Sequence, residues 1–198
     1  MKLNFWERRF ILSPLRRLVQ RHLEARQLLQ MGGQLSGGLA LEIGCGPGWG
    51  IVLIDTVFGA DEIHAFDMDH SMVMRAGRCN DRRASTVGLW AGNVRQIPAP
   101  DGSYDAVFNF GVIHHVVDWR AALGEVFRVL KPGARFYCEE ILRHYITHPI
   151  WGRLMAHPQH DRFDGAMFTT ALTQVGFEVQ CVREMGDLYV WVIADKPA

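Results

Sequence analysis

The chain has 198 residues, of which 48% are hydrophobic and 21% are charged, and its formal net charge at pH 7 is zero. This length and balance are typical of one globular domain whose core needs neither a metal nor a disulfide. A chain without net positive charge has no general attraction to nucleic acid. It also contains no run of about 18 apolar residues that would predict a membrane span.

The cysteines and the start of the chain indicate the compartment. Cys45, Cys79, Cys138 and Cys181 form no C-x-x-C pair, so their spacing predicts neither a disulfide framework nor a metal site. Isolated cysteines suit a reducing cytosol. A charged stretch, rather than the apolar run of a signal peptide, follows Met1. We therefore expect a cytoplasmic protein, with peripheral contact at the inner face of a membrane as an alternative.

The first segment is predicted to be a helix. It is basic, because residues 1–31 carry seven Lys and Arg against two Glu. Ser13 is a suitable N-cap, Pro14 fits the first turn, and two glycines follow at positions 32 and 33. The spacing of its leucines predicts one buried apolar face and a polar face turned away. We expect the buried face to hold Leu15, Leu18, Val19, Leu23 and Leu29, and the opposite face to hold Arg16, Arg17, Gln20 and Glu24.

Beyond a glycine-rich linker, strands and helices alternate, so we divide the chain into a helix and linker (1–37) and a main domain (38–198). Strands are predicted at 39–43, 63–66, 87–91, 106–110 and 135–140, with a terminal hairpin at 177–183 and 188–194. Helices are predicted at 49–57, 71–79, 119–130 (capped by Asp118) and 168–175. This alternation predicts an α/β fold with an open, doubly wound, mostly parallel sheet, which binds ligands at the carboxyl ends of its strands.

The strongest motif is the run Leu-Glu-Ile-Gly-Cys-Gly-Pro-Gly at 41–48, where an apolar strand enters alternating glycines. Glycine permits positive φ and close approach of the backbone to a ligand. A tight turn without a ligand is the alternative, which we disfavour because alternating glycines between a strand and a helix are unusual without a ligand. A nicotinamide-binding turn needs glycine where Trp49 stands, and Glu42 would repel phosphates but suit a cationic ligand.

Asp67 is the second element, at the end of the strand predicted over 63–66. A carboxylate at that position accepts hydrogen bonds from both hydroxyls of a ribose. The alternative is a helix cap, a role that Asp69 is placed to fill instead.

Together these motifs resemble those of the class I S-adenosylmethionine-dependent methyltransferases, most closely the type 11 branch of quinone-biosynthesis and small-molecule enzymes. The resemblance covers about residues 39–140. It is carried by the turn at 42–48, Asp67, the stretches Asn-Val-Arg-Gln-Ile-Pro at 93–98 and Tyr-Asp-Ala-Val at 104–107, the His pair at 114–115, and Arg-Val-Leu-Lys-Pro-Gly at 128–133.

The resemblance implies a seven-stranded sheet with an antiparallel C-terminal strand, and S-adenosylmethionine as cofactor. It implies that Glu42 lies near the cofactor amine, Asp67 at the ribose and Met68 against the adenine. The remaining implied cofactor residues are Gly44, Cys45, Gly46, Gly48, Asn93, Val94, Asn109 and Phe110. Asn93 departs from the family's usual Asp, yet it keeps one carbonyl oxygen as an acceptor for the adenine amino group.

The acceptor is expected to be a small, amphiphilic molecule, such as a quinone precursor or a lipid headgroup. Alternatives are an RNA or protein methyltransferase, although 109–112 lacks the Pro-Pro-aromatic signature of base methylation, and a non-catalytic cofactor-binding module. His115 is the candidate general base, with a packing or capping role as its alternative.

Two other segments leave alternatives open. The first helix either packs over the cleft, leans on anionic lipid, or contacts nucleic acid, the last disfavoured because it lacks interleaved aromatics. In the segment 144–161, four histidines and an aspartate suggest a metal site, but prolines interrupt it and no metal is expected. We expect this segment to cover the acceptor site with Trp151, Met155, Phe163 and Met167.

Overall fold

The computed structural model describes residues 4–80, 86–147, 158 and 160–198. Seven strands form one sheet in the order β3-β2-β1-β4-β5-β7-β6. They are β1 (Leu39–Ile43), β2 (Glu62–Asp67), β3 (Thr86–Ala91), β4 (Tyr104–Phe110), β5 (Leu130–Ile141), β6 (Glu178–Met185) and β7 (Tyr189–Asp195). Only β7 runs antiparallel to its neighbours. The predicted fold class is confirmed, and the strand order reverses between β1 and β4, where such sheets bind ligands.

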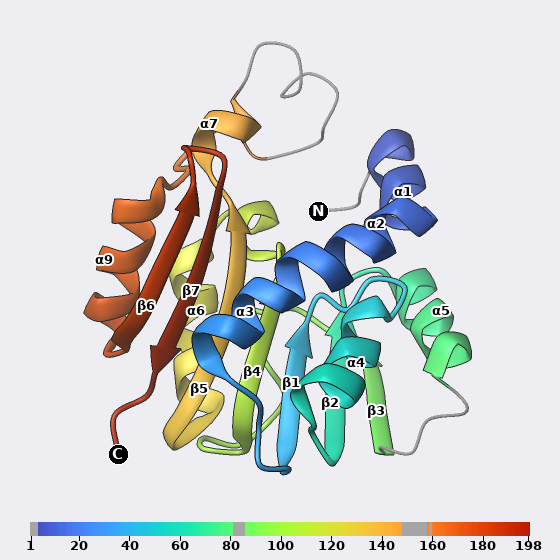
Figure 1. Cartoon of the computed structure of the whole chain (residues 1–198), viewed down its shortest axis with the longest axis horizontal. Coiled ribbons are helices and arrows are strands. Elements are labelled where there is room, and N and C mark those ends of the chain that lie inside the picture. Colours follow the sequence, from blue (N-terminus) through green and yellow to red (C-terminus); the bar gives the residue numbers. More distant parts are fainter. Residues whose placement is uncertain (1–3, 81–85, 148–157, 159) are drawn as a thin grey trace.

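Helices cover both faces of the sheet (Figure 1). They are α1 (Phe5–Ile11), α2 (Pro14–Val19), the π-helix η1 (Gln20–Glu24), α3 (Ala25–Gly32), α4 (Trp49–Leu53), the π-helix η2 (Ile54–Phe58), α5 (His70–Asn80), the 3₁₀-helix η3 (Ile113–His115), α6 (Trp119–Val129), α7 (Arg143–Ile146) and α9 (Gly165–Val175). The helices α3, α4 and α5 pack on one face, and α6 and α9 pack on the other. No helix in the described part of the chain is long and apolar enough to cross a membrane.

The helix boundaries follow the predicted caps. The Ser13 hydroxyl accepts a hydrogen bond from the Arg16 backbone N–H at 3.2 Å, and Asp118 caps α6 through the Ala121 N–H at 3.2 Å. The strand β5 begins at Leu130, earlier than predicted. Its regular pairing with β4 starts at Arg135, as predicted, because the preceding Pro-Gly stretch bulges away from β4.

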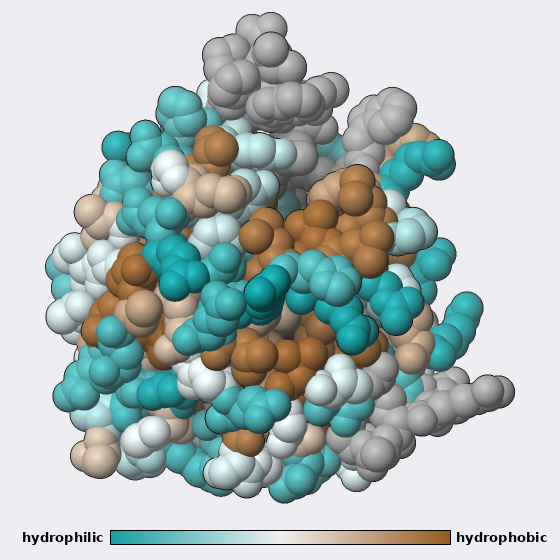
Figure 2. Space-filling model, viewed as in Figure 1, coloured by the Kyte–Doolittle hydropathy of each residue, from teal (hydrophilic) through white to brown (hydrophobic). Residues whose placement is uncertain are grey.

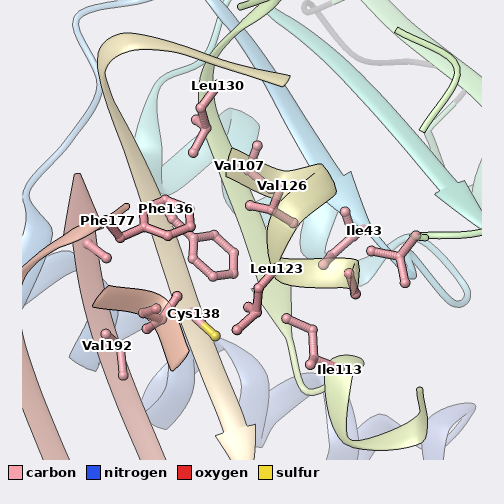
Figure 3. Packing of buried hydrophobic residues seen from close by; sticks show 14 of the residues in the cluster. Ile43, Val107, Ile113, Leu123, Val126, Leu130, Phe136, Cys138, Phe177 and Val192 are labelled. Carbon is pink, nitrogen blue, oxygen red and sulfur yellow. The ribbon is translucent and has the colours of Figure 1, made fainter. Parts of the chain in front are cut away.

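Each face of the sheet has its own apolar core. On the face of α6, Leu123 and Val126 pack against Val107, Phe136 and Cys138 (Figure 3). On the other face, residues of α3, α4 and η2 cover β1, β2 and β4. Both cores lie between the layers, so the carboxyl ends of the strands are left to the loops and to the N-terminal helices.

The N-terminal helices present the face opposite to the one predicted. Gln20 and Glu24 are each only 5% exposed, whereas Leu15 is 61% and Leu18 54% exposed. The expectation that the leucine face is buried is therefore wrong for Leu15, Leu18 and Leu23, all of which are exposed.

The reason is the pairing of polar groups and the geometry of the π-helix. Arg16, Gln20, Glu24 and Leu28 point toward the sheet at intervals of four residues, which exceed the 3.6 residues of an α-helical turn. The wider turn of η1 takes up the difference and keeps these side chains in line. Arg16, Gln20 and Glu24 form a polar stripe on the inner side of the helices. Because Arg16 and Glu24 form an ion pair at 2.5 Å, the cost of burying their charges is offset.

Candidate cofactor and acceptor site

The turn after β1 is joined to the end of β2 through Asp67. Its Oδ2 accepts a hydrogen bond from the Gly46 N–H at 2.9 Å, and its Oδ1 accepts one from the Asp69 N–H at 2.8 Å. The Cys45 N–H donates to the Phe66 carbonyl at 2.9 Å. Asp69 accepts from the Ser71 N–H at 2.8 Å, which is the capping role expected of it. The two sequence motifs therefore form one constellation at the strand ends.

The glycines of this turn face different neighbours. A side chain at Gly44 would collide with Val112, and one at Gly48 would lie 2.9 Å from Ala76. At Gly46, which has φ of +51°, the one neighbour within 4 Å among the described residues is Ile11 of α1, at 3.8 Å. The backbone at Gly46 is thus open to a ligand that lies between the turn and α1.

The Glu42 carboxylate lies beneath the turn, in space left open by Gly50, a residue that was not singled out in the sequence. A side chain at Gly50, in the first turn of α4, would overlap the Glu42 carboxylate. Burial, and to a smaller extent the charge of Asp67, raises the pKa of Glu42 well above its usual range. The Ile51 backbone N–H opposes this shift. The Oε2 atom of Glu42 has no hydrogen-bond partner among the described residues. A buried acceptor without a partner fits a ligand that carries an amine or a cation.

At the end of β4, neighbouring residues have different surroundings. Asn109 is fully buried, and its amide donates to the Glu139 carbonyl at 2.9 Å and to Glu140 Oε1 at 2.7 Å. Its carbonyl oxygen accepts from the Val112 N–H at 3.1 Å. Phe110 points to the other face and lies close to Gly50. Asn109 therefore orders the loop after β4, and Phe110 lies beside the cofactor turn.

Glu140, at the end of β5, organises this loop and was not singled out in the sequence. Its carboxylate accepts hydrogen bonds from six donors: the Asn109 amide, the His114 imidazole Nδ1 at 2.7 Å, and the backbone N–H groups of Val112, Ile113, His114 and Ile141. Burial raises the pKa of Glu140 to about 7, against the effect of these donors. The only signal in the sequence is a pair of acidic residues at the end of an apolar strand.

His114 and His115 form most of η3, next to this carboxylate. His114 is buried, His115 is half-buried, and their ring centroids are 4.1 Å apart. The Arg162 guanidinium donates to the His114 carbonyl at 2.6 Å and thereby ties η3 to the chain before α9. His114 thus anchors η3 on Glu140, and His115 lies half-buried in the loop after β4, where its role as a base stays a prediction.

The remaining cofactor candidates follow β2 and β3. Met68 is 55% exposed beside Asp67, and Val94 is buried. The Asn93 carbonyl oxygen accepts a hydrogen bond from the Arg95 N–H at 3.0 Å, so that one side-chain atom shapes the local turn. All three lie at the same edge of the sheet as the glycine turn, because β1, β2 and β3 are parallel.

The N-terminal helices lie across this edge (Figure 1). Arg8 forms an ion pair with Asp69 at 3.4 Å and donates to the Ser71 hydroxyl at 3.0 Å. The Arg17 guanidinium stacks on the Trp49 ring at 5.1 Å. These contacts agree with the interpretation of a helix packed over the cleft.

A buried carboxyl pair lies under the same helices. Burial and the neighbouring Glu24 raise the pKa of Glu139 well above its usual range, while Arg16 opposes the shift. Two carboxyls that share one buried site disfavour each other's charge, and neither Glu24 Oε2 nor Glu139 Oε2 has a hydrogen-bond partner among the described residues. Glu139 is paired with Phe110 across β4–β5 and with Trp191 across β5–β7, so these three side chains form a row on one face.

The segment after β5 departs from expectation where it is described. Phe163 is buried in the core, 4.8 Å from the Trp119 ring and 4.7 Å from the Phe168 ring, so it does not line an acceptor pocket. Trp151, Met155, His148 and His157 lie outside the described residues. Within the described part of the chain, no group of three His, Cys, Asp or Glu is arranged to hold a metal ion.

Comparison with known proteins gives the family. Residues 41–138 match the model of a methyltransferase domain, Methyltransf_11. A probable S-adenosylmethionine-dependent methyltransferase of Mycolicibacterium smegmatis is 34% identical over 152 residues, which cover 76% of this chain and 56% of the relative. A demethylmenaquinone methyltransferase of a Geobacillus strain is 33% identical over 126 residues, 61% of this chain and 53% of the relative. The chain therefore spans little more than half the length of these relatives.

Solved structures agree on the fold. A SAM-dependent methyltransferase from Aquifex aeolicus superposes with a TM-score of 0.77 at 19% identity, over 98% of this chain and 99% of that one. The [4+2]-cyclase SpnF superposes with a TM-score of 0.73 at 17% identity, over 88% of this chain and 80% of that one. The matched domain agrees with the glycine turn and with Asp67 at the end of its strand. The chain belongs to the S-adenosylmethionine-dependent methyltransferases, whose cofactor is S-adenosylmethionine.

Proposed function

We propose that this protein transfers the methyl group of S-adenosylmethionine to a small acceptor that has an apolar body and a hydrogen-bonding group. The observation that carries the proposal is the row formed by Phe110, Glu139 and Trp191 under the N-terminal helices. These three side chains are at most 6% exposed, so an acceptor would reach them only when the N-terminal helices move away from the sheet, and the strands that carry them lie about 4.8 Å apart.

The residues of the turn fit the cofactor. Gly46 offers an open backbone, Asp67 lies at the end of β2 for the ribose, and Glu42 holds a buried acceptor atom for the ammonium group. When bound, the cofactor supplies an electrophilic methyl group on a sulfonium. The contribution of the protein is then alignment and exclusion of water, and positioning alone supplies roughly 7 kcal/mol or more of a displacement barrier.

The acceptor would lie over β4 and β5. Phe110 and Trp191 would pack on its apolar body, and the Glu139–Glu24 pair would accept a hydrogen bond from a hydroxyl or amine. The curated relatives named demethylmenaquinone methyltransferases support a quinol-like acceptor, which has such hydroxyls on an aromatic body. His115 remains the candidate general base for an acceptor that must lose a proton.

The fold by itself does not establish methyl transfer, because the same fold occurs in the cyclase SpnF. The test is turnover. The purified protein is incubated with S-adenosylmethionine and a short-chain demethylmenaquinol, and formation of S-adenosylhomocysteine and of methylated quinol is followed by mass spectrometry. Bulk tRNA and a mixture of unmodified proteins are the alternative acceptors.

The expected result is methylation of the quinol and not of tRNA or protein. Glu139→Gln should raise KM for the quinol about tenfold, the effect of one lost hydrogen bond to a charged or buried group. Glu178→Gln, at an exposed position, is the matched control. Methylation of tRNA or protein alone, or no turnover with any acceptor despite cofactor binding, would contradict the proposal.

A further inference from the structure

The outer surface of the N-terminal helices is apolar and basic at once. Leu15 and Leu18 are 61% and 54% exposed one turn apart on α2, and Phe10 of α1 is also exposed. Figure 2 shows hydrophobic residues gathered over this part of the molecule, with hydrophilic side chains directly beside them. Solvent-exposed leucines on successive turns of one helix are unusual unless something covers them.

This exposure is a consequence of the fold and not of a frayed end. The helices are held against the domain by the Arg8–Asp69 ion pair, by Arg17 on Trp49, and at the end of α3 by the Tyr137 hydroxyl, which donates to the Gly32 carbonyl at 3.1 Å. With the polar stripe turned inward, the leucines have no route to the core. The helices therefore offer a fixed apolar ridge, formed by Phe10, Leu15 and Leu18.

The charges beside the apolar ridge are positive. Arg9, Arg21 and Arg26 are exposed, and no carboxylate pairs with them among the residues that the structure describes. Arg8 and Arg16 already have partners, so this excess lies on the outer side of the helices.

We propose that the apolar ridge and its flanking arginines dock this protein on the surface of an anionic lipid bilayer. Leucine and phenylalanine side chains would enter the boundary of the acyl chains while arginines bind the phosphates, as in helices that lie in the interface plane. Charge complementarity favours lipid over a second copy, because a symmetric contact through this ridge would place Arg9, Arg21 and Arg26 of both chains against each other. The inference does not depend on the proposed acceptor.

Docking in this way would orient the site. The inner side of the same helices covers the glycine turn and the Glu24–Glu139 pair, so the bilayer would contact one side of a helix whose other side faces the reaction. An acceptor dissolved in the membrane would then reach the strand ends around these helices without crossing bulk water.

Co-sedimentation with vesicles tests the proposal. The full chain is mixed with vesicles of equal parts phosphatidylglycerol and phosphatidylcholine, and with vesicles of phosphatidylcholine alone, at low and raised salt. The expected result is binding to the anionic vesicles that falls with salt. Leu15→Gln with Leu18→Gln should reduce the partition coefficient about tenfold or more, and Arg9→Gln with Arg21→Gln by a similar factor, since each arginine near anionic lipid contributes about 1 kcal/mol.

Leu188→Gln and Arg78→Gln, at exposed positions away from the ridge, are the matched controls and should bind as the unchanged protein does. Circular dichroism and affinity for S-adenosylhomocysteine verify that each variant is folded. The proposal is overturned if the unchanged protein stays in the supernatant at low salt, or if the two leucine substitutions do not weaken binding. It is also overturned if sedimentation velocity shows a dimer that the leucine substitutions dissociate, because the ridge then belongs to a second copy.

Discussion

At the scale of single residues, Asp67 holds the local backbone in place and is also the candidate to bind the ribose. Its two carboxylate oxygens hold the glycine turn and the start of the loop before α5, through the N–H groups of Gly46 and Asp69. Burial raises its pKa, and the two N–H groups oppose the shift. Each oxygen still has a lone pair for a ribose hydroxyl, so structural and binding roles coexist.

Asp67→Ala is therefore expected to weaken binding of S-adenosylhomocysteine by about 1.5–3 kcal/mol, the range for losing hydrogen bonds to a charged group. Asp67→Asn keeps one acceptor oxygen and should lose less. Titration calorimetry measures both, and thermal unfolding reports whether the turn itself has been destabilised. An unchanged Kd for Asp67→Ala would show that Asp67 serves the turn alone.

At the scale of elements, the loop after β4 depends on β5 through Glu140. Three successive backbone N–H groups of this loop donate to one carboxylate, and Val112 of the same loop presses against Gly44 of the cofactor turn. The position of η3 is thus coupled to the cofactor turn by packing.

The raised pKa of Glu140 gives this element a pH dependence with a definite sign. Because the folded pKa is about 7 and the ordinary value is 4.5, the folded state binds the proton more tightly than the unfolded state. The stability contributed by this proton is complete below about pH 4.5 and is lost as pH rises through 7.

Glu140→Gln should remove this dependence, while also lowering stability, because one acceptor oxygen is lost to several donors. Urea unfolding of both proteins between pH 5 and pH 8 gives the comparison. The free energy of unfolding of the unchanged protein, minus that of the variant, should decrease as pH rises, by about 1.4 kcal/mol for each unit of pKa shift. Parallel curves for the two proteins would contradict the assignment.

At the scale of the whole molecule, the candidate cofactor site joins parts of the chain that are distant in sequence. The turn after β1, the ends of β2 and β4, and the N-terminal helices all meet there. A ligand that binds across these parts stabilises the folded state as a whole.

S-adenosylmethionine at about 100 times its Kd should therefore add about 2.7 kcal/mol to the free energy of unfolding. For a domain of this size that raises Tm by about 5–11 °C. NAD is the control and should leave Tm unchanged, because Trp49 stands where a dinucleotide turn needs glycine. A Tm that rises with NAD and not with S-adenosylmethionine would contradict the site described above.

Much of the fold is encoded by residues that are close together in the sequence. The caps at Ser13 and Asp118, the period of the apolar residues in α6 and the glycines after β1 are each written within a few residues, so they determine the helices, the strands and the turn. Asp67 could be singled out because a polar residue at the end of a strand stands out against an apolar run. The glycine turn and its neighbour Asp67 could thus be predicted from the sequence, and their role toward the cofactor stays a prediction.

Only the tertiary structure decided the orientation of the N-terminal helices and the surroundings of Glu139 and Glu140. Periodicity reports which residues share a face of a helix, but not what that face meets. Here the sheet presents Glu139 among apolar side chains, and the π-helix turns Gln20 and Glu24 toward it. The donors to Glu140 come from residues as many as 31 positions away, and pairing of β4 with β5 alone brings them together. The sequence therefore determined the elements and the glycine turn, and long-range packing decided which polar groups are buried beside them.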